Sequence, residues 1–206
     1  MSIQSIENAV GVFQETGGVL RTKDALAKGI HSQTLYRMRD EGHIEKVSRG
    51  FYKLTGKDLI NYDFTTVALR APKAVVCLIS ACAFHEITVE IPRFVYIALP
   101  RGANKPKIDW PKTRVFYVSG EAYSAGIVTH DIAGIKVKIY DPEKTIVDCF
   151  KFRNKIGMAV AIDALKTMYE FRGKKMSIKK LSRYSQICRV QKVMSPYIQM
   201  LTQRSI

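Results

Sequence analysis

The stretch TKDALAKGIHSQTLYRMRDEGHIEKVSRGFYKL, which runs from Thr22 to Leu54, decides how the N-terminal part of this chain folds. Thr22 is expected to act as the N-cap of a short helix over residues 23–28, because its hydroxyl can accept a hydrogen bond from a free backbone N–H. Ser32 is expected to do the same for a second helix over residues 33–41. A glycine, which tolerates the backbone conformation found beyond helix ends, follows each helix as Gly29 and Gly42.

Two short alternating runs, over residues 44–47 and 51–54, flank the tripeptide Ser48-Arg49-Gly50. Alternation of this kind predicts strands, and a glycine at the tip suits a hairpin turn that needs positive φ. An amphipathic helix is predicted upstream by apolar residues at i, i+3, i+4 and i+7, namely Ile6, Ala9, Val10 and Phe13. Three helices and a hairpin make a winged helix-turn-helix, which we expect over residues 1–57.

Residues 58–206 predict a larger mixed domain. Its first part, residues 58–140, combines helices with β-branched and aromatic runs that are typical of strands. The expected elements are a helix over 62–70, a strand KAVVCLI entering a helix over 80–85, the strands RFVYIAL and RVFYVSG, and a hairpin turning at Ala133-Gly134. The fold class is therefore α+β, with a small N-terminal domain, a mixed second domain and a helical, basic C-terminal segment over 141–206.

The C-terminal segment opens with a clear helix start at Asp141, Pro142 and Glu143. Asp141 is expected to be the N-cap, Pro142 suits the first helical position, and Glu143 suits the positive end of the helix dipole. Lys144 and Asp148 stand four residues apart and are expected to form a surface pair. One face of this helix is expected to be lined by Ile146, Val147 and Phe150.

Further helices follow this start. A stripe of Met158, Ala161, Ile162, Leu165 and Met168 predicts the second helix. A third is expected to begin after Ser177, with Ile178 and Leu181 facing inward. The last, near residues 190–201, contains Pro196, which should kink or split it.

Charge is the most informative feature of the composition. The chain carries 33 Lys and Arg against 18 Asp and Glu, a net charge of +15, which predicts a polyanionic partner such as nucleic acid or an acidic protein surface. Residues 1–60 hold 9 basic and 7 acidic side chains, whereas residues 142–206 hold 14 and 4. The expected DNA-binding unit is thus not the most basic part of the chain.

The sequence lacks the motifs of metal-binding, cofactor-binding and membrane proteins. The four cysteines are scattered without a C-x-x-C pair and are expected to be reduced, buried thiols, and the four histidines show no metal-ligand spacing, so no metal or cofactor is expected. No apolar run approaches the length of a membrane span, and MSIQSIENAV does not resemble a secretory signal, which predicts a soluble, cytoplasmic protein without a membrane partner.

The sequence also argues against a nuclease site at Asp141-Pro142-Glu143-Lys144. Metal-dependent nucleases combine such an acid with an acid-x-Lys pair, and in this chain no acidic residue stands two places before a lysine. The capping role accounts for Asp141 without chemistry, so the chain is not expected to be an enzyme.

The second helix of the opening stretch carries the expected DNA contacts. Because successive residues are about 100° apart, inward Leu35 and Met38 leave Gln33, Tyr36, Arg37 and Asp40 facing outward. Gln33 and Arg37 are candidates for reading adenine and guanine in the major groove. Tyr36 is added to the contact surface, and phosphate contacts are expected from Ser32, Thr34, Arg39, Lys46, Arg49 and Lys53. The alternative is that the unit binds a protein.

Three stretches resemble the AbiEi antitoxins of type IV toxin-antitoxin systems, which act in bacterial abortive infection against phage. They are VSRGFYKL, the segment YDPEKTIVDCFKFRNKIG and the following AIDALK, and the resemblance runs through most of the chain. It implies a recognition helix over 33–39, a wing tip at Arg49, and antitoxic activity in a domain that includes the basic helices after Asp141. It also implies that the protein binds inverted repeats in its own promoter, represses the operon and counters an AbiEii-like nucleotidyltransferase toxin. An inverted repeat needs two bound copies, and we expect a monomer in solution with two copies on DNA.

The role of the basic C-terminal helices is left open. Their exposed cations are expected to contact DNA backbone, RNA or an acidic toxin face, and the candidates are Lys174, Lys175, Lys179, Lys180 and Arg183. The alternative function is a stand-alone winged-helix transcriptional regulator whose second domain senses a signal or binds another protein.

Overall fold

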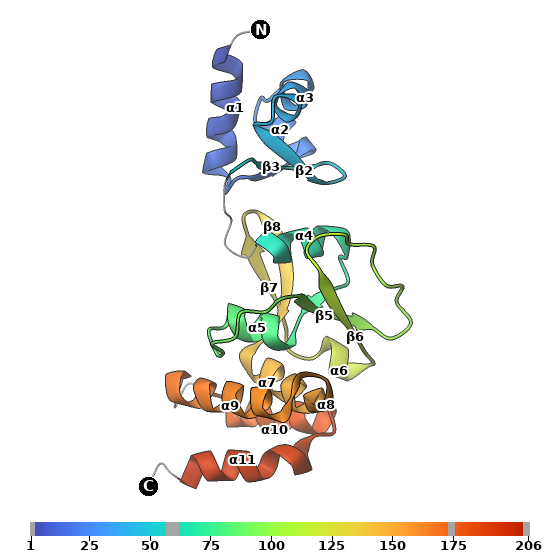
Figure 1. The fold of residues 1–206 in the computed structure, drawn as a ribbon, viewed down its shortest axis with the longest axis vertical. Helices are drawn as coiled ribbons and strands as arrows, with labels where there is room; N and C mark the ends of the chain where they lie inside the picture. The colour runs from blue at the N-terminus through green and yellow to red at the C-terminus, as the bar shows by residue number, and fades with distance from the viewer. Residues whose placement is uncertain (1–2, 57–61, 173–175, 204–206) are drawn as a thin grey trace. The chain divides into compact units, whose positions relative to one another are not determined.

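The structure is a computed structural model that describes residues 3–56, 62–172 and 176–203 (Figure 1). Its contacts divide the chain into two compact units: Met1–Pro72 with His130–Val137, and Lys73–Thr129 with Lys138–Ile206. The predicted boundary after residue 57 lies outside the described residues. The α+β class is confirmed, because a small unit of helices and a three-stranded sheet precedes a mixed sheet and a helical C-terminus.

The N-terminal unit is built as a winged helix-turn-helix. Its antiparallel sheet has the order β1-β3-β2. The elements are α1 (Ile3–Glu15), β1 (Val19–Arg21), α2 (Thr22–Ala27), α3 (Ser32–Asp40), β2 (Ile44–Ser48), β3 (Phe51–Leu54) and α4 (Tyr62–Arg70). The core of this unit confirms the predicted spacing, because Ile6, Ala9 and Phe13 of α1 are buried with Leu35 and Met38 of α3.

Both predicted helix caps in this unit are wrong. Thr22 is the first residue of α2, and both its N–H and its hydroxyl donate to the carbonyl of Gly50, at 2.8 and 3.2 Å. The hydroxyl that was expected to cap the helix is thus hydrogen-bonded to the turn of the wing. Ser32 is the first residue of α3 and makes no cap, since His31 occupies the N-cap position with extended backbone.

The chain beyond α4 contains a five-stranded mixed sheet in the order β6-β5-β4-β8-β7. Strand β4 runs antiparallel to β5 and parallel to β8, and β5 runs parallel to β6. The strands and their helices are β4 (Val75–Val76), α5 (Leu78–Phe84), β5 (Val95–Pro100), β6 (Thr113–Val118), α6 (Glu121–Ser124), β7 (Ile127–Ile132) and β8 (Ile135–Tyr140). The strand expected over KAVVCLI is only two residues long, because the chain turns into α5 at Leu78.

Five helices follow the sheet and form one group, orange to red in Figure 1. They are α7 (Pro142–Lys151), α8 (Arg153–Ile156), α9 (Met158–Arg172), α10 (Ile178–Ile187) and α11 (Gln191–Gln203). Helix α7 packs against α5, α9, α10 and α11, so every side chain from Glu143 to Phe150 is buried. No helix among the described residues is long and apolar enough to cross a membrane.

Two details of the helical segment differ from expectation. Helix α11 continues through Pro196, so the predicted split does not occur. Ile178 was expected to face inward but is 42% exposed, whereas Leu181 is buried. The buried stripe of α10 also contains Tyr184 and Ser185, and at about 100° per residue Ile178 lies about 70° from the middle of that stripe.

Candidate functional site

The outer face of α3 presents the side chains predicted to read base edges. Gln33, Tyr36 and Arg37 are exposed because Leu35 and Met38 occupy the opposite, buried face of the helix. Tyr36 is 51% exposed. The face therefore presents an amide, a phenol and a guanidinium on the surface of the helix.

Both arginines of α3 are held by carboxylates of the same helix region. The Nε of Arg37 donates to Glu41 at 2.6 Å, and Arg39 makes two hydrogen bonds to Asp40, at 2.6 and 2.8 Å. The guanidinium of Arg39 also lies over the ring of Tyr36, 5.4 Å from its centroid. The contacts orient both side chains, and those of Arg39 use only part of its five-donor guanidinium.

Some of the side chains that were predicted to contact phosphate are exposed, and others are buried or paired within the protein. Ser32 is exposed at the start of α3, and Lys46 and Arg49 are exposed on the wing. Thr34 was predicted to contact phosphate but is buried, because it faces the α1 side of the helix with Ala9 and Ile30. The structure therefore does not place Thr34 on the contact surface.

Lys53 was also predicted to contact phosphate, and the structure places it elsewhere. Its side chain is only 14% exposed and pairs with Glu45 at 2.7 Å. Its ammonium lies 4.0 Å from the ring centroid of Tyr62. A cation that is neutralised and covered in this way contributes little to a phosphate surface.

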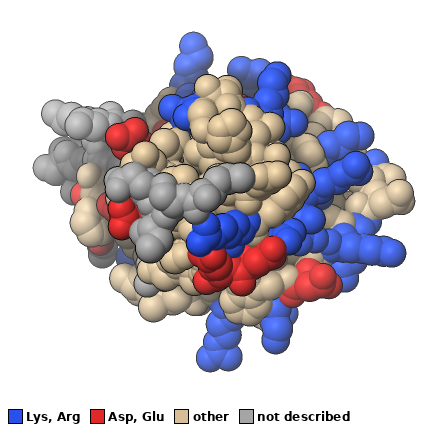
Figure 2. Space-filling model, turned by 90° about the horizontal axis from the view of Figure 1, so that it is seen from above, with Lys and Arg blue, Asp and Glu red and all other residues tan. Residues whose placement is uncertain are grey.

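The basic C-terminal candidates are not equivalent either. Lys179 and Arg183 are exposed on α10, and Arg183 makes a long, exposed contact of 3.7 Å with Glu121. Lys180 is bound to Asp141. Lys174 and Lys175 lie outside the described residues. On the face drawn in Figure 2, which is seen from above the view of Figure 1, Lys and Arg side chains are scattered, and small groups of acidic side chains lie among them.

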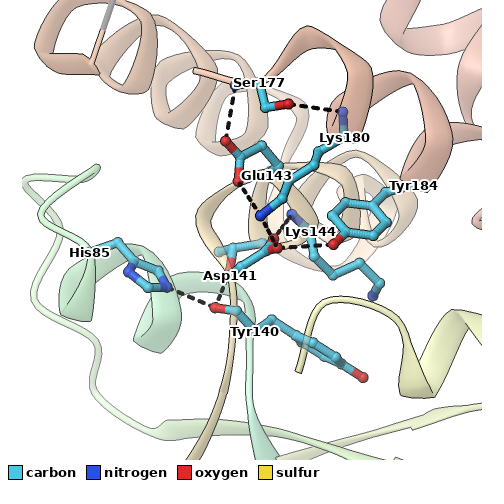
Figure 3. A network of polar contacts seen from close by, with 9 residues as sticks. His85, Tyr140, Asp141, Glu143, Lys144, Ser177, Lys180 and Tyr184 are labelled. Atoms are coloured by element: carbon cyan, nitrogen blue, oxygen red, sulfur yellow. Dashed lines mark hydrogen bonds and ion pairs between the residues drawn. The ribbon is translucent and has the colours of Figure 1, made fainter. Parts of the chain in front are cut away.

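A polar network surrounds the predicted helix start at Asp141 (Figure 3). The capping prediction is confirmed, because Asp141 Oδ1 accepts the N–H of Lys144 at 2.8 Å. Its Oδ2 accepts from Lys180 Nζ at 3.1 Å and from the Tyr184 hydroxyl at 2.9 Å. The hydrogen bond from Lys180 to Asp141 raises the pKa of Lys180. Burial, together with its own hydrogen bond to Asp141, raises the pKa of Tyr184 to about 12. One carboxylate therefore joins the start of α7 to α10.

Glu143 extends this network to the start of α10. Its Oε1 accepts the N–H of Ser177 at 3.1 Å, and the hydroxyl of Ser177 in turn caps α10 by accepting the N–H of Lys180 at 3.3 Å. On the other side, a ring nitrogen of His85 lies 2.7 Å from the carbonyl oxygen of Tyr140. The network thus connects α5, β8, α7 and α10 (Figure 3).

Lys144 and Asp148 form a buried ion pair, so the predicted surface pair is wrong. Nζ and Oδ2 are 2.6 Å apart, and the two side chains are 0% and 1% exposed. The ammonium also lies 4.0 Å from the ring centroid of Tyr140. The other Asp148 oxygen lies 3.7 Å from the Cys188 sulfur. The pair is buried because helices cover α7 on several sides, which i, i+4 spacing alone cannot reveal.

The polar groups of this network bind one another and connect the helices. Its carboxylates are occupied by a helix cap, an amide and ion pairs. Among the described residues, no group of three or more His, Cys, Asp or Glu side chains is placed to hold a metal ion. The four thiols are free and buried, and burial raises the pKa values of Cys77 and Cys188. Sequence reasoning found the cap but missed Lys180 and Tyr184 as its partners, since they lie about forty positions downstream.

Comparison with known proteins bears on the N-terminal unit. Residues 12–55 match a family model described as "Transcriptional regulator, AbiEi antitoxin", and this segment runs from α1 to the end of the wing. The predicted resemblance is confirmed there: the N-terminus carries an AbiEi-type regulator domain. The Asp141 stretch lies outside the matched segment, so its part of the resemblance stays a prediction.

Among solved structures, the chain is similar to the Rv2827c protein from Mycobacterium tuberculosis, with a TM-score of 0.59 and 12% sequence identity. The match covers 90% of this chain and 72% of that chain. At this identity the likeness concerns the fold, which extends across both units. No curated protein matches the chain.

Proposed function

We propose that this chain is a non-enzymatic antitoxin that also binds its own promoter and represses its operon. The observation that carries the proposal is a coincidence of two independent features. The segment that matches the AbiEi regulator family, residues 12–55, is also the segment that folds as a winged helix-turn-helix with an exposed polar face on α3. A neighbouring toxin of the nucleotidyltransferase type is the implied functional partner.

In this proposal α3 is the recognition helix and lies in the major groove. Gln33 pairs with adenine and Arg37 with guanine, because their side chains offer the donors and acceptors that these bases require. Ser32, Tyr36 and Arg39 contact the flanking backbone. At the wing, phosphate contacts come from Lys46 and Arg49.

An inverted-repeat operator requires two copies of the reading unit. We propose that the protein is a monomer in solution and that two copies bind the operator, one on each half-site. Half-sites are then expected about 34 Å apart, or a multiple of that distance, so that both recognition helices meet the same face of the duplex.

The second unit supplies the antitoxic activity in this proposal. Its exposed cations Lys179 and Arg183 are available to a DNA backbone or to an acidic face of the toxin. Lys180 is assigned instead to the structural network around Asp141, because it is hydrogen-bonded there.

The DNA-binding proposal is tested by comparing two arginines of the same helix in the full chain. Arg37→Ala should weaken binding to the native promoter by about 1–3 kcal/mol more than it weakens binding to a shuffled duplex, because a base contact is lost. Arg39→Ala is the matched control, and should weaken both complexes about equally because it removes a phosphate contact. Fluorescence anisotropy at fixed salt measures both. Equal losses for Arg37→Ala on the two duplexes would contradict base reading.

The antitoxin proposal is tested with the neighbouring reading frame. If that frame encodes a nucleotidyltransferase-like toxin, co-expression of this chain should restore growth. A Gln33→Ala/Arg37→Ala double variant should lose promoter repression but retain this rescue. A toxic neighbour that the chain does not counter would favour the stand-alone regulator instead.

A further inference from the structure

A hollow of about 510 Å³ lies between the wing and α4 in the N-terminal unit. Three of its lining residues are basic and none is acidic. The lining consists of Lys46, Val47, Arg49, Phe51, Leu69 and Arg70. A concave surface lined by apolar residues and cations concentrates positive potential, because the low-dielectric walls focus the field. Such a surface fits an anion.

Arg70, the last residue of α4, is fixed at this hollow by the backbone of the wing. Its Nη2 donates to the carbonyl oxygen of Val47 at 3.1 Å. The pairing of β2 with β3 shifts register between Lys46 and Ser48, so Val47 is the extra residue of a bulge. The bulge leaves its carbonyl available to Arg70. One N–H of the guanidinium is used in this way, and others remain for a ligand.

The cations of the hollow differ from three other basic residues of this unit. Arg37, Arg39 and Lys53 each pair with a carboxylate. In contrast, Lys46, Arg49 and Arg70 have no carboxylate within ion-pair distance in the part of the chain that the structure describes. Three cations without a carboxylate partner among the described residues therefore lie together at the hollow.

We infer that the hollow binds a phosphodiester group of duplex DNA, with Arg70 as its fixed cation. The inference rests on the proposed DNA binding and adds α4 to the contact surface. A guanidinium matches the geometry of phosphate oxygens, and one already held by the Val47 carbonyl loses little conformational entropy on binding. Lys46 and Arg49 approach the same hollow from the wing and supply the remaining charge.

The test is a salt titration with the full chain, using the native promoter duplex and a shuffled duplex. Arg70→Ala should weaken both complexes by the same factor, because a phosphate contact carries no sequence information. The slope of log affinity against log salt should fall by about 0.9. Between 50 and 200 mM salt, the variant should therefore lose about 3.5-fold less affinity than the wild type. Lys166→Ala, which removes one exposed charge from α9, is the control and should leave the slope unchanged.

A second set of variants protects the test against a folding defect at the Val47 contact. Arg49→Ala and Lys46→Ala remove exposed wing side chains and should reproduce the change in slope, with melting temperatures near that of the wild type. Arg49→Ala combined with Arg70→Ala should cost less than the product of the single effects, because both cations serve one phosphate.

Three results would overturn the inference. The first is an Arg70→Ala slope equal to that of Lys166→Ala while the wild type binds DNA normally. The second is a loss confined to the promoter duplex. The third is an Arg70-dependent interaction with a poly-glutamate peptide while DNA binding is unchanged, which would assign the hollow to an acidic protein. A wild-type chain that binds neither duplex would instead contradict the proposed function itself.

Discussion

Replacing Lys144 by methionine would leave Asp148 as a buried carboxylate without its cation. In the structure the two groups are 2.6 Å apart and 0% and 1% exposed, so water cannot take the place of the missing ammonium. Removing one member of such a pair costs about 3–5 kcal/mol. That is a large share of the roughly 5–15 kcal/mol by which a domain is stable. For a chain of this size the melting temperature should fall by about 6–20 °C.

The loss should depend on pH. Burial raises the pKa of Asp148 above its ordinary value, with the Lys144 charge acting in the opposite direction, so deleting Lys144 raises that pKa further. A carboxyl whose pKa is higher in the folded state stabilises the protein at low pH and loses that contribution as the pH rises through the folded pKa. The deficit of Lys144→Met should therefore shrink as the solution is acidified.

Urea unfolding and thermal melting, followed by circular dichroism, measure these effects. Lys136→Met is the matched control, because Lys136 pairs with Asp131 at 2.8 Å but both side chains are exposed, and it should change stability by less than about 1 kcal/mol. Lys144→Met/Asp148→Leu should recover most of the loss, since the buried charge disappears with its partner. Equal melting temperatures for the two lysine variants, or no recovery in the double variant, would refute the account of a costly buried charge.

Two further predictions concern the Asp141 network. The pKa of Tyr184 is raised to about 12, so its contribution to stability is complete below the ordinary tyrosine pKa of about 10 and is lost as the pH rises from 10 to 12. The difference in urea midpoint between wild type and Tyr184→Phe should shrink across that window, and a constant difference would contradict this linkage. Lys180→Ala should cost up to about 1 kcal/mol because it removes a half-exposed bond to Asp141, whereas Lys179→Ala should leave the urea midpoint unchanged; equal midpoints would argue against the bond.

Local patterns predicted the elements that depend on local physics. The period of Ile6, Ala9 and Phe13 places them in one core, and the alternation of Ile135, Val137 and Ile139 matches three buried positions in β8. The cap at Asp141 was predictable too, because its donor lies three residues away. A short-range hydrogen bond leaves a signature in residue types at fixed spacing.

Features that depend on distant segments could not be predicted in this way. Thr22 has a side chain that is typical of an N-cap, but its hydroxyl donates to the carbonyl oxygen of Gly50 in the wing. Lys144 and Asp148 have the spacing of a surface pair, but helices far away in the chain cover them. In both cases the local pattern shows which contacts a side chain is able to make. Residues that are distant in sequence determine which of these contacts it makes.

Net charge shows the same limit. Residues 1–60 carry only +2, which suggests a weak electrostatic contribution from the winged unit. The structure shows that three of its acidic side chains pair with Arg37, Arg39 and Lys53. Local neutralisation of these three leaves Lys46 and Arg49 unopposed, and Arg70, which lies beyond the counted segment, joins them at one hollow. The potential that a phosphate meets depends on which charges are already paired, so a nearly neutral unit can still present a strongly positive surface.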